Sequence, residues 1–248
     1  MKKTITSIAV SILCIIFTCS VGGYAQVFAQ NRKIPIYCVD RKDNYVAISF
    51  DAAWGADKTR QIMDICQSYN VKATFFLVGF WIDKYPDMVK EIANRGFEIG
   101  THSETHPQMS KLSAGKCKKE LESSCQKIFE LTGKMPKLFR PPFGDYNNQL
   151  IEIATDLGLY TVQWSVDSLD WKGLSARQIA ERVQKANSGD IILCHNNSDH
   201  IVEALPLIFE SFKLKNLQFC PIGDLIFADN YYIDNTGKQI LSIPNKDI

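Results

Sequence analysis

Two of the four histidines in the chain, His102 and His106, are four residues apart in the segment Thr-His-Ser-Glu-Thr-His. On a helical turn, side chains at this spacing lie on one face and can bind the same metal ion. A zinc peptidase of the His-Glu-x-x-His type needs a glutamate directly after the first histidine, but Ser103 stands there. The spacing predicts a divalent metal site of another kind, with two unrelated surface histidines as the alternative.

Asp51 and His195 each end an apolar run, at residues 46–51 and 191–195. A carboxylate at a strand end beside Trp54 is suited to act as a base, although an isolated aspartate is more often a turn residue. An imidazole that titrates near neutrality suits a general acid, although a lone histidine is more often structural. Each residue alone is a weak signal.

Arg140 opens the more specific segment Arg-Pro-Pro-Phe-Gly. Two prolines and a glycine restrict the backbone, so such a segment can hold a guanidinium and a backbone N–H in fixed directions, as an oxyanion site requires. The alternative is a rigid corner with a surface arginine. Further along, residues 166–171 place Asp167, Asp170 and Trp171 after another apolar run.

The elements that must position these residues alternate along the chain. Strands are expected at residues 45–50, 73–78, 97–100, 138–140, 160–166, 190–193 and 217–222. Helices are expected at 58–69, 86–95, 114–131, 147–157, 175–186 and 198–212, with Ser175 and Ser198 as N-caps. This alternation predicts a parallel sheet in one α/β domain, as a barrel or an open sheet. The candidate residues follow the carboxyl ends of different strands, where barrel enzymes carry their chemistry.

Composition and charge restrict the function. The net charge is +1, and Lys and Arg alternate with Asp and Glu, so no basic field predicts nucleic-acid binding. No linker divides residues 31–248, for which we expect one domain and a monomer. The chain also lacks a Gly-x-Ser-x-Gly elbow, a phosphate loop and a dinucleotide motif.

The amino-terminal segment differs from the rest. Lys2 and Lys3 precede an apolar run at residues 5–21, followed by small residues up to about residue 30. This pattern predicts a secretory signal at residues 1–30, with an uncleaved membrane anchor through residues 5–21 as the alternative. Either reading predicts a protein that acts outside the cytoplasm.

Taken in order, these segments resemble the polysaccharide deacetylases of carbohydrate esterase family 4. The family combines an aspartate-rich strand end with His-Ser/Thr-x-x-His, Arg-Pro-Pro-Tyr/Phe-Gly, Asp-x-x-Asp-Trp and Leu-x-His segments. The resemblance covers about residues 45–225, and residues 50–55 and 223–226 are most similar to an exported, sporulation-associated branch from endospore-forming bacteria. It implies a distorted (β/α) barrel of about seven parallel strands that removes N-acetyl groups from a cell-wall or spore peptidoglycan-type glycan.

The resemblance also implies roles for individual residues. His102 and His106 would bind a divalent metal, zinc or else cobalt or manganese, with Ser103 or Thr105 bracing the second histidine. Asp51 would be the base that activates water, oriented by Arg140.

On the other side of the reacting bond, His195, tuned by Asp167, would protonate the leaving amine. The backbone N–H of Phe143 would stabilise the oxyanion. A groove for sugar rings would be lined by aromatic side chains, namely Trp54, Phe143, Tyr146 and Trp171.

One position departs from the family pattern. The family carries a second aspartate as the third metal ligand, and this chain has Ala52. An alanine cannot coordinate, so the metal would keep two histidines with water or a substitute carboxylate such as Asp57, and would bind more weakly. This departure leaves a second hypothesis, that of an inactive glycan-binding protein of the envelope. A glycoside hydrolase with two carboxylates, Asp51 and Asp167 or Asp170, is a third, but it leaves the histidine pair unexplained.

Overall fold

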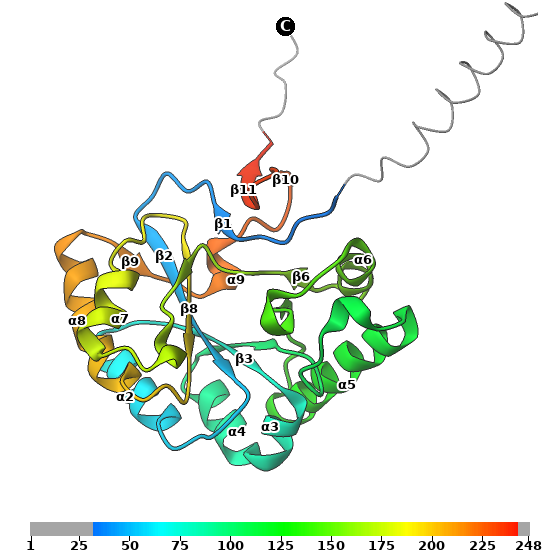
Figure 1. The fold of residues 1–248 in the computed structure, drawn as a ribbon, viewed down its shortest axis with the longest axis horizontal. Helices are drawn as coiled ribbons and strands as arrows, with labels where there is room; N and C mark the ends of the chain where they lie inside the picture. Colours follow the sequence, from blue (N-terminus) through cyan, green and yellow to red (C-terminus); the bar gives the residue numbers. More distant parts are fainter. Residues whose placement is uncertain (1–31, 243–248) are drawn as a thin grey trace, which may run out of the picture. The chain divides into compact units, whose positions relative to one another are not determined.

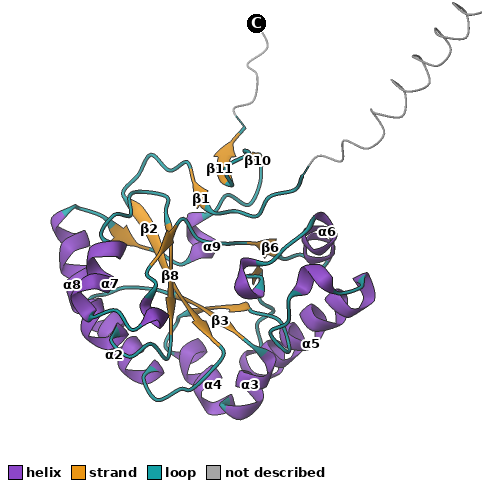
Figure 2. Cartoon of the chain, viewed as in Figure 1, coloured by secondary structure: helices purple, strands orange, loops and turns teal. Residues whose placement is uncertain are grey.

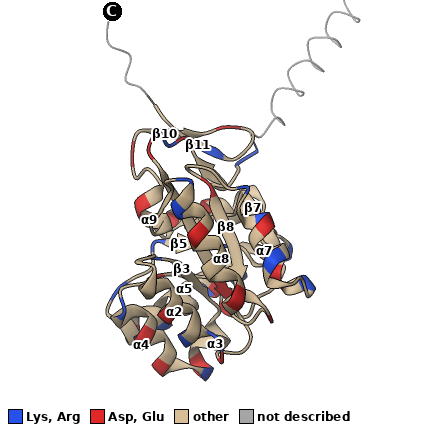
Figure 3. Ribbon diagram, turned by 90° about the vertical axis from the view of Figure 1, so that its left-hand side faces the viewer, with Lys and Arg blue, Asp and Glu red and all other residues tan. Residues whose placement is uncertain are grey.

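The computed structural model describes residues 32–242, and one compact unit begins at Ile34. The signal or anchor expected at residues 1–30 lies outside the described residues. Among the helices that are described, none is both long and apolar enough to cross a bilayer. Lys and Arg interleave with Asp and Glu over the face seen in Figure 3, which agrees with the mixed charge pattern of the sequence.

A parallel sheet forms the centre of the described chain (Figure 2). Its strand order is β6-β5-β4-β3-β2-β8-β7. The strand bounds are β2 Tyr45–Ala52, β3 Thr74–Leu77, β4 Glu98–Thr101, β5 Leu138–Phe139, β6 Tyr160–Thr161, β7 Val166–Asp167 and β8 Ile191–His195. A short strand, β9 (Gln218–Phe219), pairs with the start of β2. The two outermost strands, β6 and β7, are consecutive in the chain, so the sheet curls round as a distorted barrel. This confirms the predicted fold class.

Helices surround the sheet (Figure 1). Their bounds are α2 Thr59–Ser68, α3 Gly79–Lys84, α4 Pro86–Asn94, α5 Ala114–Thr132, α6 Asn148–Asp156, α7 Ala176–Val183, α8 Ile201–Leu214 and α9 Ile222–Leu225. In the described part of the chain, three single turns of 3-10 helix lie in the segments after β4, β5 and β7, namely η1 Met109–Lys111, η2 Pro142–Gly144 and η3 Asp170–Lys172. The main apolar cluster lies between sheet and helices and draws on β2, β3, β8, α2, α4, α7 and α8.

A small second sheet lies at the end of the barrel where β2 begins (Figure 1). In it, β1 (Cys38–Val39) pairs in parallel with β11 (Lys238–Leu241), which pairs in antiparallel with β10 (Tyr231–Ile233). Cys38 also forms a bridge to Asp190, directly before β8. The amino ends of the strands are therefore covered, and the carboxyl ends are left for the site.

Local structure departs from the sequence prediction in several places. The single strand expected at residues 160–166 is two strands, because residues 160–161 pair with β5 and residues 166–167 pair with β8, at opposite ends of the strand order. Helix α3 was not predicted. Ser198 is not an N-cap, since α8 begins at Ile201 and the Ser198 hydroxyl instead donates to the carbonyl oxygen of Asp170 (2.8 Å). Ser175 does cap α7, in a capping box with Gln178.

Candidate active site

Asp51 lies near the end of β2, paired in register with Phe76 of β3 and His195 of β8. Its side chain is 6% exposed and accepts a hydrogen bond from Nη1 of Arg140 (2.7 Å). Burial favours the neutral acid, but the positive charge of Arg140 and the neighbouring imidazoles outweigh it, so the pKa of Asp51 lies below its ordinary value. Asp51 is therefore ionised at neutral pH, as a base must be.

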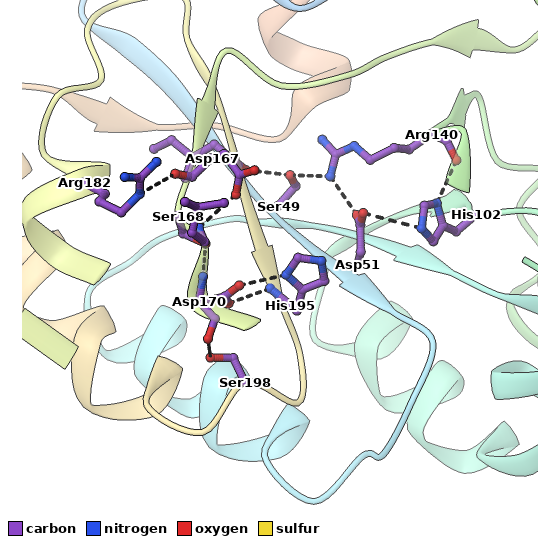
Figure 4. A network of polar contacts seen from close by, with 12 residues as sticks. Ser49, Asp51, His102, Arg140, Asp167, Ser168, Asp170, Arg182, His195 and Ser198 are labelled. Carbon is purple, nitrogen blue, oxygen red and sulfur yellow. Dashed lines mark hydrogen bonds and ion pairs between the residues drawn. The ribbon is translucent and has the colours of Figure 1, made fainter. Parts of the chain in front are cut away.

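Arg140 follows β5 and is fully buried. Its Nη1 also donates to the Ser49 hydroxyl (2.8 Å), and its Nη2 donates to the carbonyl oxygen of Gln163 (3.1 Å). The guanidinium carbon lies 4.1 Å from the ring centre of Phe76. A planar group held on several sides in this way has one orientation, which fixes the Asp51 carboxylate in turn (Figure 4).

Gln163 and Ser49 are supporting residues that sequence reasoning missed. Besides accepting from Arg140, Gln163 donates through Nε2 to the carbonyl oxygen of Gly144 (3.2 Å). It thereby connects the arginine to the turn Pro142–Gly144, in which Phe143 has a φ of 59°. Neither residue carries a sequence signal, because a buried Gln or Ser between apolar residues has no distinctive spacing.

His102 and His106 lie close together, with their ring centres 4.9 Å apart. The helical turn assumed from their spacing is wrong: residues 102–106 form a loop in which Ser103 and His106 have φ angles of 71° and 57°. The Ser103 hydroxyl accepts the backbone N–H of His106 (3.0 Å), as the bracing role of Ser103 requires. Thr105 instead contacts Glu120, through a hydrogen bond of 2.7 Å from its hydroxyl.

The two imidazoles suit a divalent metal ion in their chemistry. Burial lowers the pKa of His102, and it lowers that of His106 to about 4, so both rings are neutral at pH 7, the form that binds metals. The Arg140 carbonyl oxygen lies 2.7 Å from Nδ1 of His102 and accepts a hydrogen bond from that N–H, which leaves the lone pair on Nε2. That nitrogen lies 3.5 Å from Oδ2 of Asp51.

No third protein ligand accompanies this pair. Among residues 32–242, no three His, Cys, Asp or Glu side chains are placed to share an ion. Ala52 is fully buried in the main apolar cluster, and Asp57, the proposed substitute, is exposed with its carboxylate beside Gly55. The site therefore fits an ion held by two imidazoles, with the remaining positions open to water or substrate.

His195 ends β8 and contacts Asp170, whereas the resemblance implied Asp167 as its partner. Asp170 accepts the backbone N–H of His195 (2.8 Å) through one oxygen and lies 2.7 Å from its ring Nδ1 through the other. The Asp167 carboxylate accepts the N–H of Leu169 instead (2.8 Å). The reason is the left-handed turn at Leu169 (φ 52°), which directs Asp170 toward the histidine (Figure 4).

Asp170 sets the charge of His195. Burial disfavours the imidazolium, but the hydrogen bond and negative charge of Asp170 outweigh it, so the pKa of His195 lies above its ordinary value. The site thus pairs a carboxylate whose pKa is lowered with an imidazole whose pKa is raised, which is the arrangement that acid–base catalysis needs.

Exposed aromatic side chains border the site. Trp54, Phe143 and Trp171 are 57%, 66% and 60% exposed, and the rings of Trp54 and Phe143 lie on His106 at 5.2 Å and 4.5 Å. Phe80, which sequence reasoning missed, adds to this border, 6.4 Å from Trp54. The fourth predicted aromatic, Tyr146, is half-buried against the cluster that contains Phe139 and Leu150.

The arrangement of base, acid, histidine pair and aromatic border can be compared with known families. The family model described as polysaccharide deacetylase matches residues 39–162. The chain belongs to the polysaccharide deacetylase family. The first part of the site, from Asp51 to Arg140 and Phe143, lies within the matched region, and His195 lies beyond it.

Several relatives have names that state an activity. A peptidoglycan-N-acetylglucosamine deacetylase of Bacillus cereus is 38% identical over 73% of this chain and 67% of its own length. The peptidoglycan-N-acetylmuramic acid deacetylase PdaA of Bacillus subtilis is 30% identical over 77% of this chain and 74% of its own length. The uncharacterized Bacillus subtilis protein YlxY is 35% identical over 77% of this chain, but the match spans only 60% of YlxY.

A solved structure shows that the family fold also occurs without activity. The chain is similar to a Bacillus anthracis protein described as a CE4 family pseudoenzyme, with a TM-score of 0.75 and 31% identity over 77% of this chain and 68% of that one. A mutant of that protein is described as having restored enzymatic activity, with a TM-score of 0.75 and 32% identity over 77% and 70% of the two chains. Membership of the family therefore does not decide whether a chain is active, and the side chains of the site must be considered.

Proposed function

We propose that this chain removes N-acetyl groups from a cell-wall glycan of the peptidoglycan type, as a hydrolase exported from the cytoplasm. The observation that carries the proposal is the pairing of Asp51 with Arg140 on one side of the site and of His195 with Asp170 on the other. A buried carboxylate and an imidazole whose pKa values are shifted in opposite directions are typical of catalytic sites. The relatives named as peptidoglycan deacetylases support the substrate class.

In this proposal Asp51 takes a proton from the attacking water, and Arg140 holds the carboxylate toward it. His195 gives a proton to the nitrogen of the leaving sugar, and Asp170 keeps the imidazole protonated until that step. The backbone N–H of Phe143, in the rigid Pro142–Gly144 turn, faces the developing oxyanion. Trp54, Phe143 and Trp171 offer flat apolar surfaces on which sugar rings stack, and Tyr146 offers less exposed surface.

His102 and His106 would hold the divalent ion that the family uses, with zinc the first candidate and cobalt or manganese the alternatives. When bound, such an ion would act as a Lewis acid toward the amide oxygen. We further propose that the chain acts as a monomer in the cell wall or spore envelope, released from the signal at residues 1–30 or anchored through residues 5–21, with residues 31–248 as the catalytic domain. Acetate release from N-acetylated glycans tests the activity.

The dependence of the rate on pH should report the Asp170–His195 pair. His195 acts as an acid while it is protonated, so the rate should fall as the pH rises through its raised pKa. Asp170→Asn removes the anion, burial then lowers the pKa, and the basic limb should move down by about 1–3 pH units. The matched control is Asp167→Asn, whose carboxylate bonds to Leu169 and raises the pKa of His195 through its charge alone; its basic limb should move down by much less. If the basic limb moves further in Asp167→Asn than in Asp170→Asn, Asp167 is the residue that keeps His195 protonated.

The second candidate function, glycan binding without turnover, is favoured by one observation, the alanine at position 52. Ala52→Asp tests it, because the resemblance makes this the position of the missing ligand. We expect tighter zinc binding and faster acetate release than in the parent chain. A carboxylate at this buried apolar position should also lower the stability of the metal-free variant by several kcal/mol, and zinc should restore it.

Ala53→Asp is the matched control, since Ala53 belongs to the same apolar cluster and is 7% exposed. It should lose stability without any gain in zinc affinity. Equal zinc affinities for Ala52→Asp and the parent chain would show that position 52 is not a ligand position.

A further inference from the structure

The loop that carries His106 has an unusual backbone. Two residues with side chains, Ser103 and His106, lie in the left-handed region with φ angles of 71° and 57°. Such conformations are strained for residues with side chains and persist only where the surroundings hold them. The proposed metal site therefore depends on whatever holds residues 103–106 in place.

Glu120 of α5 accepts several hydrogen bonds from this loop. Its Oε2 accepts the backbone N–H groups of Glu104 (3.0 Å) and Thr105 (2.8 Å), and its Oε1 accepts the Thr105 hydroxyl (2.7 Å). Three donors from two consecutive residues thus end on one carboxylate, directly before His106. Hydrogen bonds to an ionised acceptor are about twice as strong as those between neutral groups.

Other side chains on the same face of α5 contact the segment from Thr101 to Met109, which contains both histidines. Side chains at positions 117, 120, 124 and 127 succeed one another at helical spacing. Cys117 donates to the carbonyl oxygen of Met109 (3.3 Å), Ser124 hydrogen-bonds to Thr101, and Lys127 forms an ion pair with Glu104. These neighbours contact the two ends of the segment or a side chain on it, whereas Glu120 alone among them binds the backbone between the two histidines.

We propose that Glu120 is a positioning residue that holds the imidazole of His106 beside that of His102 for metal binding. The proposal rests on the metal-binding role given to the two histidines above. Ser103 fixes the N–H of His106 itself, and Glu120 fixes the two peptide groups before it. Without Glu120, these peptide groups lose their acceptor, and the left-handed conformation of His106 competes with more extended ones.

The test compares Glu120→Ala and Glu120→Gln with Glu122→Gln as the matched control. Glu122 lies on the same helix in an exposed ion pair with Lys118 (3.6 Å) and does not contact the loop. Two quantities are measured, the zinc affinity of the purified full-length chain and the amide hydrogen exchange of residues 103–106 in the metal-free protein. Thermal unfolding of each variant shows whether the fold is intact.

We expect Glu120→Ala to bind zinc about 10–100-fold more weakly, the usual effect of losing a partner that orients a ligand. Exchange at Glu104 and Thr105 should be faster, with little change in the unfolding temperature. Glu120→Gln keeps one acceptor oxygen and should recover part of both properties. The control should match the parent chain.

Faster exchange in Glu120→Ala with unchanged zinc affinity would overturn the proposal, because Glu120 would then stabilise the loop without positioning the ligand. Unchanged exchange would overturn it as well. Failure of the parent chain to bind zinc, cobalt or manganese would instead count against the proposed function, and the exchange measurement would still decide whether Glu120 holds the loop.

Discussion

Asp51→Asn and His195→Ala should each lower the rate of acetate release about 10²–10⁴-fold, the usual range for general acid–base groups. Asparagine keeps the shape of the side chain and a hydrogen bond to Arg140 but cannot take a proton. Alanine at position 195 removes the acid and leaves Asp170 without its partner. The rates are measured on the same N-acetylated glycan, at saturating metal.

Glycan binding should change much less in these two variants, because the aromatic border of the site remains. Trp171→Ala should show the reverse pattern, with weakened retention in a glycan pull-down. Asp199→Asn serves as the matched control: Asp199 follows His195 in the next loop, its side chain is 83% exposed, and its substitution should leave both rate and binding unchanged. If Asp51→Asn and His195→Ala keep the parent rate while Trp171→Ala alone abolishes retention, the chain is a binding protein.

Arg140→Met should have the largest effect on stability. Arg140 is fully buried and bonded to Asp51, so its removal leaves an uncompensated buried carboxylate, a change that typically costs about 3–5 kcal/mol. The free energy of unfolding from urea titrations measures this loss. Arg140→Lys should not recover it, since an ammonium cannot reach Asp51, Ser49 and the Gln163 carbonyl in their separate directions.

The loss of stability in Arg140→Met should also depend on pH, and the direction of this dependence follows from the pKa of Asp51. In the parent chain the pKa of Asp51 is lowered, so its ionisation stabilises the fold above the unfolded pKa, and this contribution is lost as the pH falls through the folded value. Without Arg140, burial raises that pKa, and the carboxylate is protonated as the pH falls. The difference between variant and parent should therefore be largest near pH 7 and shrink toward about pH 4.

Arg60→Met is the matched control, because Arg60 forms its ion pair with Glu91 at the surface. Its unfolding free energy should differ little from that of the parent chain at either pH. A pH-independent loss in Arg140→Met would indicate that packing against Phe76, and not the charge of Asp51, dominates the effect.

The fold class and the residues that form the site could be predicted from the sequence. Apolar runs alternating with helical patterns predicted a parallel sheet, and the family resemblance implied its barrel form. The positions of Asp51, Arg140 and His195 after strand ends predicted that they would meet. These predictions were possible because the carboxyl ends of parallel strands lie at the same edge of a sheet. Residues that follow different strands are therefore brought together there.

Contacts made by irregular backbone could not be predicted in the same way. His195 pairs with Asp170 and not with Asp167 because Leu169 adopts a left-handed conformation. Leucine rarely adopts this conformation, so its presence in the sequence does not predict the turn. The histidine pair was expected on a helix and lies instead in a loop held by Glu120, fifteen residues beyond Thr105. The division of residues 160–166 into β6 and β7 depends on their pairing with β5 and β8, which lie elsewhere in the chain, so no local signal marks it.

The most direct test of the proposed deacetylase activity is acetate release by the unmodified chain. Release is measured from peptidoglycan and from chitooligosaccharides, with zinc, cobalt or manganese at saturation. We expect release from at least one glycan, and a rate indistinguishable from the background when Asp51 is replaced by asparagine. No release from either glycan with any of the three metals would contradict the proposed activity and leave glycan binding as the function of the site.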